Sequence, residues 1–176
     1  MSGLLKIIVI AGPNGAGKTT FAKQYLGQFE HPIPFVNADL MAAGIAPLSP
    51  DSVAILAGRL MIEEIDRLVE QRKSFAFETT LSGKGYAKKL AVWSALGYEI
   101  TVVFLKLPSV CHAIKRVRAR VTQGGHDIPE SVIRRRFDAG WKNFETIYKN
   151  LVSTWYVLDA DDNMEVLQFG GGPNHD

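Results

Sequence analysis

The sequence predicts a single α/β domain built on a parallel sheet of five strands, with helices between the strands. The first observation behind this prediction is an alternation of short β-branched or aromatic runs with longer stretches of helical periodicity, the pattern of consecutive β-α-β units. The second is a glycine-rich segment that joins the first apolar run directly to a helical stretch. Composition agrees, since 176 residues with 47% hydrophobic and 22% charged side chains are typical of one globular domain.

The strands are expected where β-branched and aromatic residues run together. Residues 7–10 and 100–105 are almost continuously apolar, which is typical of parallel strands that are buried on both faces. The five expected strands are Leu4–Ala11, Ile33–Asn37, Ser74–Glu78, Glu99–Lys106 and Ser153–Leu158.

Helices are expected in the intervals between these strands. Ser49 followed by Pro50 is a start signal, with serine as the N-cap and proline at the first helical position. The expected helices are Lys18–Gln28, Pro50–Gln71, Lys84–Leu96, Ser109–Gln123 and Pro129–Lys149, with a glycine-containing hinge at residues 124–128 between the last two. We therefore expect one domain over residues 1–169, in which residues 109–149 form a helical lid, and a flexible tail over residues 170–176.

Several classes of protein are excluded by composition. No apolar run approaches the ~20 residues that a membrane-spanning helix needs. The apolar opening is interpreted as the first strand because it leads straight into the glycine-rich segment and has its single basic residue, Lys6, inside the run. Cys111 is the only cysteine, which fits a reducing compartment. We expect a cytoplasmic protein that has no membrane contact.

The strongest functional pattern is the sequence Gly-Pro-Asn-Gly-Ala-Gly-Lys-Thr at residues 12–19, which satisfies G-x-x-x-x-G-K-[ST]. Its three glycines let the backbone curl so that N–H groups face phosphate oxygens, and the helix that follows adds its positive end. Lys18 can then reach the β- and γ-phosphates, and the Thr19 hydroxyl can hold Mg²⁺. A glycine-rich turn without a ligand is the alternative, but such a turn does not require Lys-Thr after the third glycine.

The expected nucleotide is ATP rather than GTP, because no N-K-x-D segment for guanine recognition is present. The predicted nucleotide-binding residues are Gly12, Pro13, Asn14, Gly15, Ala16, Gly17, Lys18, Thr19, Thr20 and, from the lid, Arg116.

Two acidic residues fall at the carboxyl ends of predicted strands, where ligands bind in open parallel sheets. Asp39 follows the second strand and Glu78 ends the third. Phosphoryl transfer needs one group that orients or deprotonates the acceptor hydroxyl and one that holds Mg²⁺ or its waters. Asp39 could instead be a helix cap or turn former, whereas Glu78 at the end of an apolar strand needs a partner that offsets its desolvation. Nearby side chains that could hydrogen-bond an acceptor are Asn37, Thr79, Thr80 and Ser82.

Positive charge gathers in the predicted lid. Residues 106–149 carry ten Lys or Arg against four Asp or Glu, while the rest of the chain carries ten against fourteen. Arginine stays charged and its fork matches phosphate oxygens, so hinged arginine-bearing helices can neutralise the transferred phosphoryl group. Arg116 and Arg120 are four residues apart and share a helix face, whereas Arg118 points elsewhere. A solvated helix face is the alternative for each arginine.

A nucleic-acid-binding patch is a second alternative for residues 106–149. Its aromatic residues recur at three- to four-residue spacing, as in the core stripe of a helix. The formal net charge of the whole chain is only +2. We therefore expect no nucleic-acid partner.

The chain resembles the zeta-toxin-like family of P-loop kinases, in particular its short bacterial members described as predicted ABC-type ATPases. The resemblance covers nearly the whole chain and is carried by four segments: residues 11–22, 36–39, 75–83 and 116–136. The middle two segments and the Gly-Gly-His-Asp-Ile-Pro element of the fourth are more specific than the phosphate motif alone. The resemblance implies a three-layer αβα fold that binds ATP and Mg²⁺ and, as in the better understood zeta toxins, phosphorylation of a hydroxyl on the amino sugar of UDP-N-acetylglucosamine.

The same resemblance implies roles for single residues. Asp39 corresponds to the catalytic base of the family and Glu78 to an acceptor-side residue. Arg120 and Arg134 correspond to catalytic lid arginines, which leaves Arg136 on the surface. An antitoxin protein is a candidate partner on the same grounds.

Three functions remain open on the sequence. The first is an ATP- and Mg²⁺-dependent kinase that acts on a nucleotide sugar. The second is a nucleotide-binding switch or regulatory ATPase, which would hydrolyse ATP slowly and gain nothing from a small acceptor. The third is a nucleoside or polynucleotide kinase, for which binding to RNA ends would depend steeply on salt.

Overall fold

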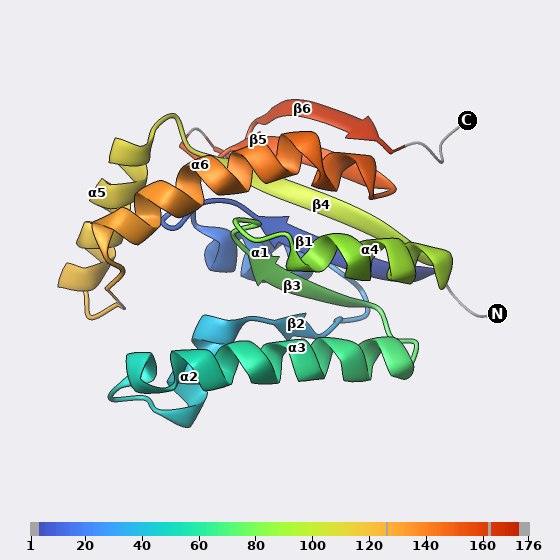
Figure 1. The fold of residues 1–176 in the computed structure, drawn as a ribbon, viewed down its shortest axis with the longest axis horizontal. Coiled ribbons are helices and arrows are strands. Elements are labelled where there is room, and N and C mark those ends of the chain that lie inside the picture. Colours follow the sequence, from blue (N-terminus) through green and yellow to red (C-terminus); the bar gives the residue numbers. More distant parts are fainter. Residues whose placement is uncertain (1–3, 126, 162, 173–176) are drawn as a thin grey trace.

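The protein is described by a computed structural model that covers residues 4–125, 127–161 and 163–172. These residues form a six-stranded sheet with the strand order β2-β3-β1-β4-β5-β6 (Figure 1). The first five strands are parallel and β6 runs antiparallel to β5. The predicted α/β class with a parallel sheet is therefore confirmed, and the sheet has one strand more than expected.

The strands lie close to their expected positions. They are β1 (Leu5–Ala11), β2 (Phe35–Val36), β3 (Phe75–Thr79), β4 (Tyr98–Lys106), β5 (Thr154–Asp159) and β6 (Val166–Gly171). Only β2 is much shorter than predicted, because Pro32 and Pro34 precede it and proline cannot donate to a ladder.

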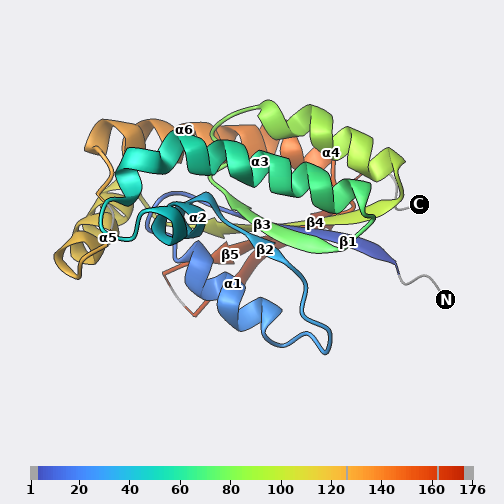
Figure 2. The same cartoon turned by 90° about the horizontal axis from the view of Figure 1, so that it is seen from below.

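The helices cover both faces of the sheet. They are α1 (Lys18–Leu26), α2 (Ala38–Ile45), α3 (Ala54–Glu70), α4 (Gly85–Ala95), α5 (Val110–Thr122) and α6 (Glu130–Thr146), with single 3-10 turns at Pro50–Val53 and Tyr148–Asn150. Figure 2 shows α3, α4 and α6 on one face of the sheet and α1 on the other. The domain is thus a three-layer αβα sandwich.

Strand β1 is the centre of the core. Ile7 and Val9 pack with α3, α4 and α6, while Ile8 and Ile10 pack with α1. All four side chains are at most 4% exposed, as expected for a strand covered on both faces. This packing fixes the end of β1, from which the glycine-rich loop emerges.

Two elements differ from the expectation. Residues 38–45, which had no assignment, form α2, because Asn37 caps this helix by accepting a hydrogen bond from the Leu40 N–H at 3.0 Å. Gly170 and Gly171, expected in a tail, belong to β6, which pairs with β5 through residues 166–171. The rest of the expected tail beyond Gly172 lies outside the described residues, as does His126 of the expected hinge.

Among the described residues, no single helix has the length and apolar character needed to cross a bilayer. Helix α2 together with residues 50–70 meets that test only as a pair bent by 110°.

Candidate active site

The glycine-rich loop has the backbone that the motif predicts. Gly12, Gly15 and Gly17 adopt φ values of 143°, 82° and 82°, a region that residues with a Cβ rarely enter. A Cβ on Gly12 would also lie 2.5 Å from the Leu105 carbonyl oxygen of the neighbouring strand, whereas a Cβ on Gly17 would meet nothing within 4 Å. The loop is therefore tight against the sheet at its start and open at its end, where α1 begins.

Lys18 lies in a buried position at the start of α1. Its Nζ donates to the Pro13 carbonyl at 2.9 Å and lies 3.8 Å from Glu78 Oε1. Burial lowers the pKa of this amine, the carboxylates of Glu78 and Asp39 oppose that shift, and the positive charges of Arg120 and Arg136 reinforce it. Among the described residues the ammonium group thus donates one hydrogen bond, to the Pro13 carbonyl, which phosphate oxygens could replace.

Glu78 has the partners that its burial requires. Its Oε2 accepts a hydrogen bond from the Thr19 hydroxyl at 2.7 Å and another from Asn37 Nδ2 at 2.6 Å. Strand β3 lies between β1 and β2, so the three side chains meet at the carboxyl ends of adjacent strands. Asn37 and Glu78 were expected on the acceptor side, and in the structure both contact the hydroxyl of Thr19.

A cavity of about 180 Å³ lies beside this cluster. It is lined from the loop by Asn14 and Lys18, from the second and third strand ends by Asn37, Ala38, Asp39, Glu78, Thr79 and Thr80, and from α6 by Arg136. We call it the phosphate cavity. Asp39 sits in the first turn of α2 and is exposed; the capping role that was its alternative belongs to Asn37 instead.

The predicted lid arginines have different surroundings. Arg116 donates to the Ala160 carbonyl at 3.0 Å and to Asp161 Oδ1 at 2.8 Å, beyond the end of β5. Arg134 forms an exposed pair with Glu130, whose second oxygen accepts from Arg118. The structure therefore does not bring Arg134 into the phosphate cavity.

Arg136, which we expected on the surface, is the arginine of the second trio that lines the phosphate cavity. Within residues 4–125, 127–161 and 163–172 it makes no hydrogen bond or ion pair. Arg120 does not line this cavity, yet its charge, like that of Arg136, reaches Lys18. This corrects the assignment of Arg136, and the reason is the rotation of α6, which buries Ile133, Gly140 and Phe144.

Helix α6 also holds the segment that follows β3. Asn143 Nδ2 donates to the Leu81 carbonyl at 2.9 Å and to the Ser82 carbonyl at 3.1 Å, and Gly140 has no room for a Cβ against the Thr80 carbonyl. Arg136, Gly140 and Asn143 are spaced by four and three residues and form one helix face. We call this face the α6 stripe. Sequence reasoning missed it, although a glycine inside a long helix is a sign of close backbone approach.

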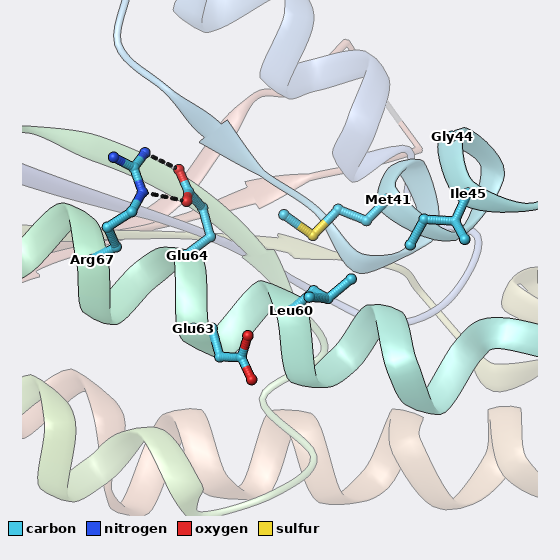
Figure 3. A pocket seen from close by; sticks show the side chains of 7 residues that line it. All are labelled: Met41, Gly44, Ile45, Leu60, Glu63, Glu64 and Arg67. Carbon is cyan, nitrogen blue, oxygen red and sulfur yellow. Dashed lines mark hydrogen bonds and ion pairs between the residues drawn. The ribbon is translucent and has the colours of Figure 1, made fainter.

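A separate cavity of about 530 Å³ lies between α2 and α3 and includes no residue of the glycine-rich loop (Figure 3). Met41 from α2 and Leu60 from α3 point toward one another across it, and the Glu64–Arg67 ion pair lies at one end. Its mostly apolar lining has no grouping suited to phosphoryl transfer.

The site fits a nucleotide phosphate and Mg²⁺ on two further observations. Asn14 Oδ1 is buried without a hydrogen-bond partner in the described part of the chain, and it belongs to a residue that lines the phosphate cavity. The Thr19 hydroxyl donates its proton to Glu78 and accepts a long hydrogen bond from Asn37 Nδ2 at 3.4 Å, which leaves one oxygen lone pair for a cation. No group of three or more His, Cys, Asp or Glu suited to a metal occurs among the described residues.

The fold and this loop define the protein as a P-loop protein of the kinase-like class. A model of the AAA domain family matches residues 7–147, and the chain belongs to that family. A Haemophilus influenzae protein described as uncharacterized is 30% identical over 132 residues, which are 75% of this chain and 92% of the relative.

Solved structures share the fold at low sequence identity. The PezAT toxin–antitoxin system of Streptococcus pneumoniae matches with a TM-score of 0.67 and 15% identity over 96% of this chain and 72% of the other. The AvrRxo1-ORF1:-ORF2 complex with ATP matches with a TM-score of 0.74 and 14% identity over 97% of this chain and 61% of the other. A gluconokinase from Sinorhizobium meliloti matches with a TM-score of 0.56 and 17% identity over 92% and 86%.

Proposed function

We propose that this protein is a kinase that transfers the γ-phosphoryl group of ATP to a hydroxyl of a small molecule. The observation that carries the proposal is the phosphate cavity, in which Lys18, Asp39 and Arg136 come together from three separate elements. These are a phosphate-binding cation, a base and a charge-neutralising arginine, the set that phosphoryl transfer requires. The gluconokinase among the structural neighbours, the AvrRxo1 complex solved with ATP and the zeta-toxin resemblance support the same proposal.

Each residue has a role that follows from its contacts. Lys18 exchanges the Pro13 carbonyl for phosphate oxygens, and the loop N–H groups orient those oxygens. Thr19, which donates its proton to Glu78, would hold Mg²⁺ through its hydroxyl oxygen, and that ion would supply charge neutralisation at the phosphates. Arg136, and Arg120 from α5, add positive potential where charge spreads over the transferred group.

Asp39 acts on the acceptor. Its carboxylate accepts the hydroxyl proton as the O–H bond breaks and the acceptor oxygen bonds to the γ-phosphorus. The bond from that phosphorus to its bridging oxygen breaks, and the electron pair leaves with ADP. The proton then passes from Asp39 to solvent, so the net products are ADP, the phosphorylated acceptor and one proton.

We further propose a nucleotide sugar such as UDP-N-acetylglucosamine as the acceptor, on the resemblance of residues 36–39 and 75–83 to zeta toxins. The test is mass spectrometry of a reaction with Mg²⁺, ATP and a mixture of UDP-sugars, nucleosides and short RNA. A phosphorylated UDP-sugar should form with the wild type and with Lys23→Ala, an exposed lysine on the same helix, but not with Lys18→Ala. If every acceptor stays unmodified while ATP is bound, the kinase proposal fails and the regulatory switch takes its place.

A protein partner is a separate proposal. The descriptions of two structural neighbours name a partner protein. They are the PezAT toxin–antitoxin system and AvrRxo1-ORF1 with ORF2. We propose that this chain likewise has an antitoxin-type inhibitor. Expression of the chain in bacteria should slow growth, and Lys18→Ala should restore it. Normal growth with active, expressed wild-type protein would contradict this proposal.

A further inference from the structure

The segment that follows β3 contains a backbone conformation that residues with a Cβ rarely adopt. Leu81 has a φ of 52°, in the left-handed region, and its side chain is only 1% exposed. A bulky residue stays in this region only where its surroundings hold it there, and such residues cluster at functional sites. We call residues 79–83 the β3 turn. The turn borders the phosphate cavity, because Thr79 and Thr80 are among the residues that line it.

Two buried side chains hold the β3 turn from outside the cavity. Asn143 of α6 donates to the Leu81 and Ser82 carbonyls at 2.9 and 3.1 Å. Tyr148, in the 3-10 turn after α6, is fully buried, and its hydroxyl donates to the Gly83 carbonyl at 2.6 Å. Three successive carbonyls of the turn are therefore bound by two side chains, neither of which lines the phosphate cavity.

The left-handed residue fixes the hydroxyl of Thr79. The chain turns back at Leu81, so that the Leu81 N–H donates to Thr79 Oγ1 at 3.1 Å. Among the described residues the hydroxyl proton of Thr79 has no acceptor, so it is available to a ligand oxygen in the phosphate cavity. The neighbouring Thr80 hydroxyl shares a hydrogen bond of 2.9 Å with that of Ser82, which restricts its rotation.

Such fixed hydroxyls matter in phosphoryl transfer, where the protein contributes mainly positioning and electrostatic stabilisation. A group that meets a substrate works well when packing and hydrogen bonds hold it within about 0.5 Å of its productive position. A misplacement of about 1 Å can cost roughly 10²-fold in rate. Side chains that hold the β3 turn can therefore affect the reaction without contact with the substrate.

We propose that Asn143 and Tyr148 are positioning residues of the proposed kinase. They hold Leu81 in its left-handed conformation and so present the Thr79 hydroxyl as a hydrogen-bond donor to the acceptor molecule. The inference rests on the proposed function and deepens it. The group of the acceptor that meets Thr79 is an oxygen with a free lone pair.

The variants are chosen to separate positioning from stability. Tyr148→Phe removes one hydroxyl and leaves the ring in the core. Tyr98→Phe is the matched control, because Tyr98 is also buried and its hydroxyl also donates to a backbone carbonyl, that of Lys73, at 3.1 Å. Tyr98 begins β4, at the end of the sheet opposite the phosphate cavity. Asn143→Leu, a more severe change, is the second test variant.

Hydrogen exchange of the Leu81 amide, followed by NMR without substrates, measures the turn itself. Exchange of the β1 amides, in the core, reports global unfolding and is the internal reference. Relative to that reference, we expect exchange at Leu81 to be about tenfold or more faster in Tyr148→Phe than in Tyr98→Phe.

Steady-state kinetics measure the consequence for transfer. The acceptor is UDP-N-acetylglucosamine, or whichever acceptor of the mixture above the wild type phosphorylates. Tyr148→Phe and Asn143→Leu should lower kcat/KM for the acceptor by about tenfold or more and leave the KM for ATP within about twofold of the wild-type value. Tyr98→Phe should change neither quantity.

Three results would overturn the inference: equal Leu81 exchange in Tyr148→Phe and Tyr98→Phe, an unchanged kcat/KM for the acceptor in both test variants, or a KM for ATP that rises as much as that for the acceptor. The proposed function fails separately. A wild type that phosphorylates no acceptor refutes the kinase, and with it the role of these residues in transfer. The Leu81 exchange, which needs no substrate, then still decides whether the two side chains hold the turn.

Discussion

Replacing Lys18 with methionine should separate the function of this lysine from its contribution to stability. The side chain is 7% exposed, and burial is the largest influence on its pKa, so the charged amine is desolvated in the folded protein. Its removal costs one hydrogen bond from a charged donor, about 1.5–3 kcal/mol, and relieves a desolvation penalty of several kcal/mol. Glu78 keeps Thr19 and Asn37 as donors. We therefore expect the free energy of unfolding of Lys18→Met to fall by no more than about 1 kcal/mol.

The stabilisation of the protein by bound nucleotide, unlike its stability without nucleotide, should be lost in Lys18→Met. A ligand at a hundred times its Kd stabilises the native state by about 2.7 kcal/mol. For a chain of this size each kcal/mol shifts Tm by about 2–4 °C. Mg²⁺ and ATP at that saturation should raise the Tm of the wild type by about 5–11 °C and leave that of Lys18→Met unchanged.

Thermal and urea unfolding, each with and without Mg²⁺ and ATP, measure both effects. Lys23→Met, at an exposed position of α1, is the matched control and should keep the nucleotide shift. A variant that unfolds several degrees lower without nucleotide, or one that keeps the full shift with nucleotide, would refute this reasoning.

The pKa of Lys18 also predicts a pH dependence. Because the folded-state pKa is lowered from 10.5, the unfolded chain binds more protons at this residue in the alkaline range. The stability of the wild type relative to Lys18→Met should therefore rise as pH increases toward 10.5. A relative stability that falls over this range would show that the shift has the opposite sign.

The remaining predictions concern the base, the arginines and the α6 stripe. Asp39→Asn should keep ATP binding and lose about 10²–10⁴-fold in transfer rate, measured by coupled assay; an unchanged rate would remove this residue from the chemistry. Arg136→Ala should lower kcat, whereas Arg134→Ala, whose partner is exposed Glu130, should leave it unchanged; the reverse order would restore the family assignment. Asn143→Leu should cost about 2–4 kcal/mol in urea unfolding, because one buried and one partly buried carbonyl lose their donor; a cost equal to that of exposed Asn150→Leu would show that these two hydrogen bonds contribute little to stability.

The fold was predictable from sequence where the information is local. The buried strand at residues 7–10 and the glycine-rich loop after it require little more than periodicity and backbone geometry. Strand β6 was not predicted, because a short exposed edge strand with two glycines at its end has a weak pattern, and its pairing with β5 is a tertiary contact.

The geometry of the candidate site was predictable around the glycine-rich loop and only partly in the predicted lid. Three successive arginines at residues 134–136 point in three directions, and the rotation of the helix decides which one lines the phosphate cavity. That rotation depends on how Phe144 and Gly140 pack in the core. A sequence motif does not determine this packing. The link between Glu78 and Thr19 likewise needs the strand order, because β3 could have been placed elsewhere in the sheet.

The α6 stripe has a thermodynamic consequence. Arg136 and Asn143 are seven residues apart, a distance of about 10 Å along one stiff helix, and Asn143 is bonded to the carbonyls that follow the acceptor-side threonines. In the proposed kinase, a phosphate group that draws Arg136 inward would pull through the same helix on the carbonyls of Leu81 and Ser82. Linkage is reciprocal, so the factor by which ATP changes acceptor affinity must equal the factor by which the acceptor changes ATP affinity. In the proposed kinase, we therefore expect ATP and the acceptor to influence each other's binding through α6.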